Sequence, residues 1–367
     1  MRLVTALLCV VLLTSSSSHA FSPLQPQPEQ QQQRSSQRPS TTVIVEEQTD
    51  AVTESVVSSL ERQRVESILP LTEAEINARL AMQMERLQAK DRTSTFLSKQ
   101  DLQIVYEDED LIIVDKPTGV LSVPGKIVNP SMAQSVFDAV GCEMGRMDMM
   151  VVHRLGMDTS GLMVFAKTMD ALRGMNEVFR TRAIERKYEA LVCGHVESDA
   201  GIINLPLMRD YEFPPFMRVS TENHQRALLD LDPEQLRLPK ILDLPKDSLT
   251  KYKVLAREDL NGLPVTRVAL TSLSGRTHQL NVHLAAFGHP IVGDATYGID
   301  GDAASNGGLT KEERDELVPN PSCASDELQR RIARTANGKM SCIHAKSLKF
   351  FHPTLQEEIA FVADAPF

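Results

Sequence analysis

The sequence of 367 residues predicts an α+β fold with a mixed sheet. Two observations lead to this prediction. Short apolar segments of strand length recur from about residue 102 to the C-terminus, and only a few amphipathic segments of helical length lie between them. Because strands and helices do not alternate one for one, the pattern favours an α+β arrangement. The apolar content of 42% is enough to form a packed core.

The expected strands are short segments rich in β-branched and aromatic residues. A first strand follows Leu102, and a tight acidic turn separates it from the second. The later strands are expected at residues 111–114, 149–152, 162–166, 188–192, 252–256, 266–271, 346–351 and 359–362.

Three segments have the apolar spacing of amphipathic helices. The first covers residues 72–89, where Thr72 and Glu75 have the spacing of a capping box. The second begins with Asp170 as its cap, and the third covers residues 277–287, after which Gly and Pro end it. We expect the first helix to lie outside the main domain.

The first 100 residues differ in composition from the rest of the chain. Residues 1–20 combine Arg2, a short apolar run and small residues before Ala20, as in a cleaved signal peptide. Residues 21–43 are rich in Ser, Gln and Pro, a composition typical of a disordered transit peptide. Together they resemble the bipartite plastid presequence of algae such as diatoms, with the secretory pathway as the alternative. Residues 44–100 predict a charged linker that carries the first helix.

The cysteines favour a reducing compartment. One of the five, Cys9, lies in the expected signal peptide. The other four show no CxxC spacing and are too sparse for a disulfide framework. Their pattern therefore supports a plastid location over secretion.

The charge of the chain is unusual for a protein that binds a polyanion. The formal net charge is −10, and residues 101–367 hold 29 basic and 38 acidic side chains. Affinity for nucleic acid must therefore come from a local patch. Residues 173–187, with five basic and two acidic side chains, are a candidate. We expect the main domain at 101–367, with surface insertions at about 230–248 and 299–340.

Four segments of the sequence, taken in order, resemble the motifs of a known family. They are 111–126 (LIIVDKPTGVLSVPGK), 153–168 (HRLGMDTSGLMVFAKT), 185–196 (ERKYEALVCGHV) and 274–298 (SGRTHQLNVHLAAFGHPIVGDATYG). Together they resemble the ordered motifs of the RluA-type RNA pseudouridine synthases, and SCIHAKSLKFFHP near the C-terminus is similar too. The resemblance extends from about Ile104 to the end of the chain.

The resemblance implies one catalytic domain with a mixed sheet, a central cleft and no cofactor or metal. In this family a uridine of structured RNA is flipped into the cleft, its glycosidic bond is broken, and the uracil is rejoined through a ring carbon. The implied partner is rRNA or tRNA, not DNA. The resemblance also implies a monomer, and no membrane contact is expected after removal of the presequence.

The resemblance also assigns the site. Glycosidic bond cleavage needs a carboxylate beside the anomeric carbon, and the family places an Asp directly after His-Arg-Leu, where this chain has Gly156. Arg154 is expected to fill the space of the flipped base and Tyr188 to stack on the uracil and relay a proton. Arg276 is expected to pair with the missing Asp, and Leu280 to line the pocket.

Further residues are expected to assist. Asp158 is a possible substitute for the missing carboxylate, although residues i and i+2 of an extended segment lie roughly 6–7 Å apart. Arg276, without its Asp, is expected to find another acid, water or an RNA phosphate. Three more residues are expected to contact RNA: His153, Arg182 and Lys187.

Three functional interpretations therefore remain open at this point. The first is an active pseudouridine synthase. The second is an RNA-binding protein that keeps the cleft and has lost the chemistry, because Gly156 supplies neither a nucleophile nor a base. The third is an enzyme of another reaction class on the same fold, since fold alone does not determine chemistry.

Overall fold

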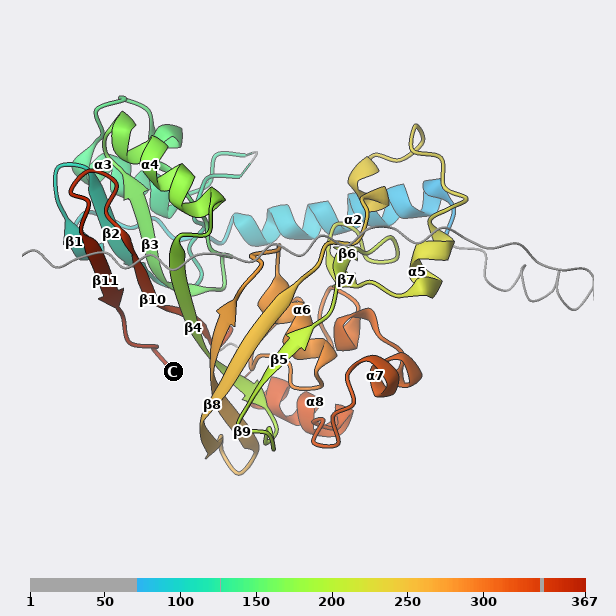
Figure 1. Ribbon diagram of the computed structural model, residues 1–367. Coiled ribbons are helices and arrows are strands. Elements are labelled where there is room, and N and C mark those ends of the chain that lie inside the picture. The colour runs from blue at the N-terminus through green and yellow to red at the C-terminus, as the bar shows by residue number, and fades with distance from the viewer. Residues whose placement is uncertain (1–70, 126, 337–339) are drawn as a thin grey trace, which may run out of the picture. The chain divides into compact units, whose positions relative to one another are not determined.

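The computed structural model describes residues 71–125, 127–336 and 340–367 (Figure 1). The predicted signal and transit segments, residues 1–43, lie outside the described residues, as does the first part of the predicted linker. None of the described helices is long and apolar enough to cross a bilayer.

A nine-stranded mixed sheet forms the centre of the domain, with strand order β1-β2-β3-β10-β4-β9-β8-β5 and β11 paired to β10. The described strands of this sheet pair antiparallel, except that β3 and β10 are parallel. The strands are β1 (Gln103–Glu107), β2 (Leu111–Lys116), β3 (Ser160–Ala166), β4 (Ile184–Cys193), β5 (Ala200–Asn204), β8 (Leu249–Asp259), β9 (Pro264–Ser272), β10 (Ile343–Phe351) and β11 (Glu358–Val362). This sheet confirms the predicted α+β class.

The helices and a small second sheet pack around this sheet. Strands β6 (Leu207–Arg209) and β7 (Met217–Val219) form a separate antiparallel pair. The helices are α2 (Glu73–Asp91), α3 (Met132–Val140), α4 (Met169–Arg180), α5 (Glu222–Ala227), α6 (Gln279–Ala286), α7 (Lys311–Leu317) and α8 (Asp326–Thr335). Helices α7 and α8 lie within the stretch predicted to be an insertion at 299–340.

Strands β2 and β3 show why these segments form the middle of a sheet. Both are apolar along most of their length, and the residues of β3 are all buried. Ile112 and Phe165 pack into one hydrophobic cluster, whereas Ile113 and Val164 pack into another. Because successive side chains of a strand point to opposite faces, a strand buried on both faces is apolar at nearly every position.

Two of the predicted elements are wrong in detail. Residues 149–152 do not form a strand: Met147–Met150 form a 3₁₀ turn, and only Val151 makes an isolated bridge, to Phe165. The cap of α4 is Thr168, whose hydroxyl accepts from the backbone N–H of Ala171. Asp170 therefore lies in the first turn of the helix, where its negative charge interacts favourably with the positive end of the helix dipole.

Helix α2 begins as predicted, with the capping box of Thr72 and Glu75. The expectation that it lies outside the main domain is wrong. Ile76 is fully buried in a cluster with residues of the 211–241 region. The Asn77 side-chain amide donates to the carbonyl of Gln235 at 2.7 Å, and the Arg79 guanidinium donates to the carbonyl of Glu212 at 2.8 Å. The apolar stripe of α2 is thus part of the core.

Candidate active site

A cavity of about 630 Å³ opens where the loop before β3, strand β4 and the β9–α6 loop meet. Five residues predicted to belong to one site line it: Arg154, Gly156, Tyr188, Arg276 and Leu280. These residues are separated by up to 126 positions in the sequence, so only the fold brings them together. The order of the motifs therefore identified a real pocket.

The loop that carries Arg154 and Gly156 is held by buried hydrogen bonds on both sides. The hydroxyl of Ser122 donates to the carbonyl of Leu155 at 2.8 Å and accepts from its N–H at 3.0 Å. The backbone N–H of Gly119 donates to the carbonyl of Met157 at 2.9 Å. The Pro/Gly-rich loop that follows β2 is therefore the support of the catalytic loop.

Lys116 joins these two loops from inside the protein. It is fully buried, and its Nζ donates to the carbonyls of Pro117, Val120 and Met157 at 2.8, 2.7 and 3.0 Å. Burial lowers the pKa of Lys116 to about 7, although the nearby Asp158 carboxylate favours the charged form. Three carbonyl acceptors fit the three donors of an ammonium group, so Lys116 fixes the loop geometry.

Gly156 is exposed at the cavity, and its backbone is not in the left-handed region that favours glycine. A Cβ placed on it would meet one side chain within 4 Å, the hydroxyl oxygen of Thr159 at 3.3 Å. This contact is tight, but a hydroxyl can rotate away. The site therefore has room for a side chain at position 156. The backbone conformation does not require glycine there, so the missing carboxylate changes the chemistry of the site and not its backbone.

Tyr188 lies on β4 opposite Leu270 of β9, and its ring is half-buried between two hydrophobic clusters. Burial raises the pKa of Tyr188, and the nearby Arg186 guanidinium lowers it. The phenol is therefore neutral at neutral pH. A neutral ring at the cavity wall can stack on a base, and its hydroxyl can pass on a proton.

Arg276 is positioned by Gln279, which is buried. The side-chain oxygen of Gln279 accepts from the Arg276 backbone N–H at 2.9 Å, and its amide donates to the carbonyl of Leu249 at 2.9 Å. The Arg276 guanidinium is half-buried and donates from Nε to the carbonyl of Asp247 at 3.1 Å. A backbone carbonyl therefore contacts the guanidinium that was expected to find another acid, water or an RNA phosphate.

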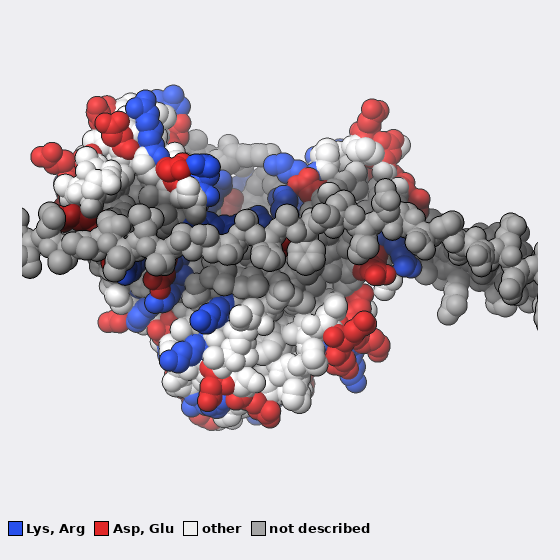
Figure 2. Space-filling view, in the orientation of Figure 1, with Lys and Arg blue, Asp and Glu red and all other residues white. Residues whose placement is uncertain are grey.

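The charge of the cavity is one-sided. Four arginines line it, namely Arg154, Arg186, Arg209 and Arg276, and no Asp or Glu does so among the described residues. None of these arginines forms an ion pair within the described part of the chain. Acidic side chains gather elsewhere, for example over α7 in Figure 2. The cavity is thus a local positive site in an acidic protein.

Two of these arginines add to the predicted site. Arg186 belongs to the basic segment 173–187, and its place on β4 two residues before Tyr188 puts both on the same face of the strand. Arg209 was not predicted, because it lies on the short strand β6, far from the four motifs. Gln279 was missed as well, although its position three residues after Arg276 is the spacing of a local hydrogen bond at a helix start.

Asp158 does not line the cavity. Its carboxylate binds the Nζ of Lys90, on α2, at 2.5 Å. This ion pair occupies the carboxylate at a point outside the cavity. The geometry therefore gives no support to Asp158 as the substitute for the missing Asp.

The three other residues expected to contact RNA also lie outside the cavity lining. His153 accepts from the backbone N–H of Val164 at 3.0 Å and stacks on Phe179, with ring centroids 4.9 Å apart. Burial, helped by the charge of Arg186, lowers the pKa of His153 to about 3, so the ring is neutral. His153 thus holds the end of the catalytic loop.

Lys187 and Arg182 are separated from the cavity for different reasons. Lys187 is the neighbour of Tyr188 on β4, so it points to the opposite face of the strand, and its Nζ binds Glu185 at 2.5 Å. Arg182 follows α4 and lines a second hollow beside the cavity. Neither residue can contact a base inside the cavity.

One cluster has residue types that can bind a metal. Ligand atoms of Asp210, Glu212 and His224 lie within 4.8 Å of one another. The guanidinium of Arg218 already faces both acids, 3.9 Å from Asp210 and 3.3 Å from Glu212. Because the Arg218 cation already pairs with both carboxylates, the cluster is an ion-pair group.

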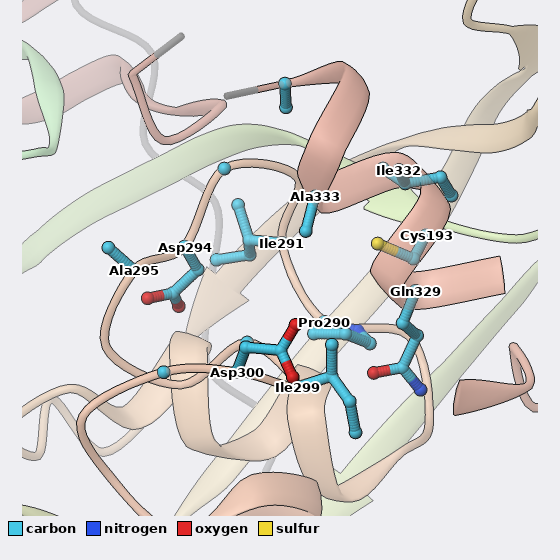
Figure 3. Close-up of a pocket in the computed structure, with 14 residues that line it drawn as sticks. Cys193, Pro290, Ile291, Asp294, Ala295, Ile299, Asp300, Gln329, Ile332 and Ala333 are labelled. Atoms are coloured by element: carbon cyan, nitrogen blue, oxygen red, sulfur yellow. The ribbon is translucent and has the colours of Figure 1, made fainter. Parts of the chain in front are cut away.

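Another hollow of about 300 Å³ lies between α8 and the 290–301 loop (Figure 3). Asp294 faces into it, but its carboxylate accepts from the Asn281 side chain at 2.8 Å and from two backbone N–H groups. Burial raises the pKa of Cys193 to about 12, so this thiol is not a nucleophile. The residues predicted to form the site therefore line the arginine-lined cavity and not this hollow.

Comparison with known proteins gives the family of this chain. Residues 110–286 match the family model described as RNA pseudouridylate synthase. The chain is 34% identical over 266 residues to the dual-specificity RNA pseudouridine synthase RluA of Pasteurella multocida, covering 72% of this chain and 94% of that one. The chain belongs to the RNA pseudouridine synthase family. Members of this family are isomerases, and RNA is the substrate class.

Other relatives support this family assignment. The RluA protein of Vibrio vulnificus is 35% identical over 252 residues, which cover 68% of this chain and 78% of that protein. The structure of human RNA Pseudouridylate Synthase Domain Containing 1 superposes with a TM-score of 0.51 at 24% identity, over 74% of this chain and 87% of the human one. This human structure shares the pseudouridine synthase fold, which confirms the predicted architecture.

Proposed function

We propose that this protein isomerises uridine to pseudouridine in structured RNA, either rRNA or tRNA, by flipping the base into the arginine-lined cavity. One observation carries the proposal. Four arginines that form no ion pair with any described residue line one pocket together with a neutral Tyr188, in an acidic protein. A flipped nucleotide supplies both of the features that such a pocket lacks, a negative phosphate and a flat base.

The geometry assigns a role to each part of the cavity. Arg154 is exposed, so it can move into the stack when the base leaves it. Tyr188 stacks on the uracil and takes part in proton transfer, and Leu280 closes the apolar side. Arg276 and Arg186 bind phosphate or the polarised uracil carbonyls. The base is held this way while the glycosidic bond breaks and re-forms.

The second candidate function is RNA binding without turnover on the same fold. It is favoured by Gly156, which offers no carboxylate beside the sugar, and by the engagement of Asp158 with Lys90. Both functions require RNA to bind in the cavity. They differ only in whether pseudouridine forms.

The deciding experiment measures tritium release from [5-³H]uridine-labelled rRNA and tRNA, because isomerisation replaces the hydrogen on carbon five. We compare the full chain with Tyr188→Phe, Gly156→Asp and Gly156→Asn. A positioned carboxylate contributes about 10²- to 10⁴-fold in rate, so Gly156→Asp is expected to release tritium at least about 100-fold faster. Gly156→Asn is the matched control, because it has the same shape without the charge.

The outcomes separate the two candidates. Tritium release by the natural protein that is lost in Tyr188→Phe supports an active enzyme. Release by Gly156→Asp alone supports the RNA-binding alternative. If no variant releases tritium and none binds RNA, the cavity is not an RNA site and both candidates are rejected. Asp158, whose carboxylate binds Lys90, and Asp115, which lies on β2, do not line the cavity. Asp158→Ala and Asp115→Ala are therefore expected to change nothing in this assay.

The composition of the first 43 residues supports a plastid as the site of action. A fluorescent reporter fused to residues 1–43 and expressed in a diatom is expected to enter the plastid. Appearance of the reporter in the medium would instead support the secretory pathway.

We further propose that the protein acts as a monomer and has lower affinity for DNA of the same sequence than for RNA. Light scattering and competition binding test these two points.

A further inference from the structure

We propose that a groove next to the cavity binds the nucleotide that neighbours the flipped uridine. The proposal rests on the proposed RNA-binding function and extends it. The groove has a volume of about 670 Å³ and lies between the end of α4, the start of β4, the end of β9 and the edge formed by β10 and β11. Its occupant is a single-stranded nucleotide, held by stacking and by its phosphate.

The groove is continuous with the cavity. Arg186, Ser272 and Gly275 line both of them. Gly275 has φ +67°, and a Cβ there would come within 3.2 Å of the Arg186 guanidinium. Glycine at this position therefore leaves room for Arg186 at the border. A chain that leaves the cavity past Arg186 enters the groove directly.

The groove exposes apolar surface that the core does not use. Phe351 is 59% exposed and Leu273 is 47% exposed, and both line the groove. The Arg186 guanidinium lies 5.6 Å from the centre of the Phe179 ring, so this pair forms a second flat surface. Exposed aromatic rings and arginine planes beside a basic path are the platforms on which unpaired bases stack.

The charges of the groove favour a phosphate. Its two acids are neutralised by lysines, because Glu185 binds Lys187 at 2.5 Å and Glu358 binds Lys349 at 3.0 Å. The arginines that line the groove, Arg182 and Arg186, form no ion pair within the described residues. The groove therefore has a net positive charge, which continues the positive charge of the cavity. This continuity favours RNA over a peptide as the occupant.

Arg182 occupies a position that helices usually give to glycine. It follows α4 with φ 59°, and its N–H donates to the carbonyl of Phe179 at 3.3 Å. A left-handed backbone conformation is unfavourable for a residue other than glycine, because the Cβ comes too close to the following carbonyl oxygen. An exposed guanidinium kept at a strained position is consistent with a functional role.

The test uses fluorescence anisotropy with two probes, an RNA stem-loop with an unpaired uridine loop and uridine monophosphate. The variants are Phe351→Ala, Arg182→Gly and both together. Stem-loop binding by the double variant is expected to weaken about 10-fold, which is the size of one lost stacking contact. Uridine monophosphate binding is expected to stay unchanged, because this probe fills the cavity alone. Leu355→Ala is the matched control, because Leu355 is 54% exposed and lies outside the groove.

The result also separates this proposal from the proposed function. If Arg276→Ala weakens stem-loop binding and the groove variants do not, the groove proposal is rejected and the cavity remains an RNA site. If Arg276→Ala has no effect either, the proposed function itself fails. A stem-loop with 4-thiouridine beside the target uridine is expected to crosslink to groove residues, and a crosslink elsewhere contradicts the proposal. Competition by peptides instead of RNA would identify a protein-binding groove.

Discussion

The two faces of the strand pair β4–β9 hold arginines in opposite electrostatic surroundings. On one face Arg267 binds Glu189 at 2.7 Å and Glu258 at 2.6 Å. Lys346 extends this group by contacting Glu189 at 3.5 Å and Asp364 at 2.9 Å. On the other face, around Tyr188, the arginines of the cavity have no carboxylate partner among the described residues.

This difference assigns stabilisation of the fold to one face of the sheet and function to the other. Tyr188 and Glu189 are adjacent in sequence, so the alternation of a strand sends one to each face. Paired charges stabilise the folded chain, whereas like charges without partners repel one another and destabilise it. Residues that break the rules of stable packing are expected at functional sites. The unpaired face is therefore the one kept for a ligand.

The largest expected effect comes from removing charge on the unpaired face. Arg154→Ala combined with Arg276→Ala is expected to weaken RNA binding about 100-fold at low salt, because each phosphate contact releases counterions. The steepness with which the logarithm of the RNA-binding constant decreases with the logarithm of the salt concentration is expected to become smaller by roughly 0.7 to 0.9 for each lost phosphate contact. The free energy of unfolding is expected to stay the same or rise. Arg331→Ala, on the exposed side of α8, is the control.

A smaller effect is expected from the paired face. Arg267→Met leaves Glu189 and Glu258 without their shared cation, and the free energy of unfolding measured in urea is expected to fall by roughly 2 kcal/mol. RNA affinity is expected to be unchanged. If Arg267→Met weakens RNA binding while stability holds, the two faces do not divide their roles as described here.

The effect that is smallest at neutral pH, and that grows as the pH falls, comes from the titration of His153. Because the pKa of His153 is lowered to about 3 in the folded chain, the unfolded chain takes up its proton first, near pH 6.5. The contribution of His153 to stability is therefore complete above pH 6.5 and is lost as pH falls toward 3. His153→Gln keeps an acceptor for the Val164 N–H and does not titrate. Its unfolding free energy is expected to depend less steeply on pH between 4 and 6, by at most about 1.4 kcal/mol per pH unit. An unchanged slope would show that His153 is charged in the folded protein.

Much of the fold could be predicted from local patterns. The β2 and β3 segments are apolar runs bounded by turn residues, and Thr72 with Glu75 marks the start of α2. The strand predicted at 149–152 was wrong because a short apolar run does not reveal whether its backbone has a partner. Met150 is buried in a 3₁₀ turn, which satisfies the same hydrophobic pattern.

The site could be predicted only as far as the motifs reach. Tyr188 and Arg276 lie in segments with a recognisable order, and the fold brings both to one cavity. Arg209 lies outside these segments, and nothing in its neighbours marks it. The sequence pattern also does not reveal in which direction a side chain points. His153 turns to the backbone of β3 and Lys187 to the far face of β4, although both adjoin residues of the cavity.

Helix α2 sets a limit on how far the N-terminus can be shortened. A protease that cuts before Glu73 leaves the contacts of Ile76 and Lys90 intact. A cut beyond Asp91 would uncover the cluster around Ile76 and release the Asp158 carboxylate two residues from Gly156. The length of the N-terminal segment is thereby linked to the loop that carries Gly156, and a chain that starts at residue 93 is expected to melt at a lower temperature.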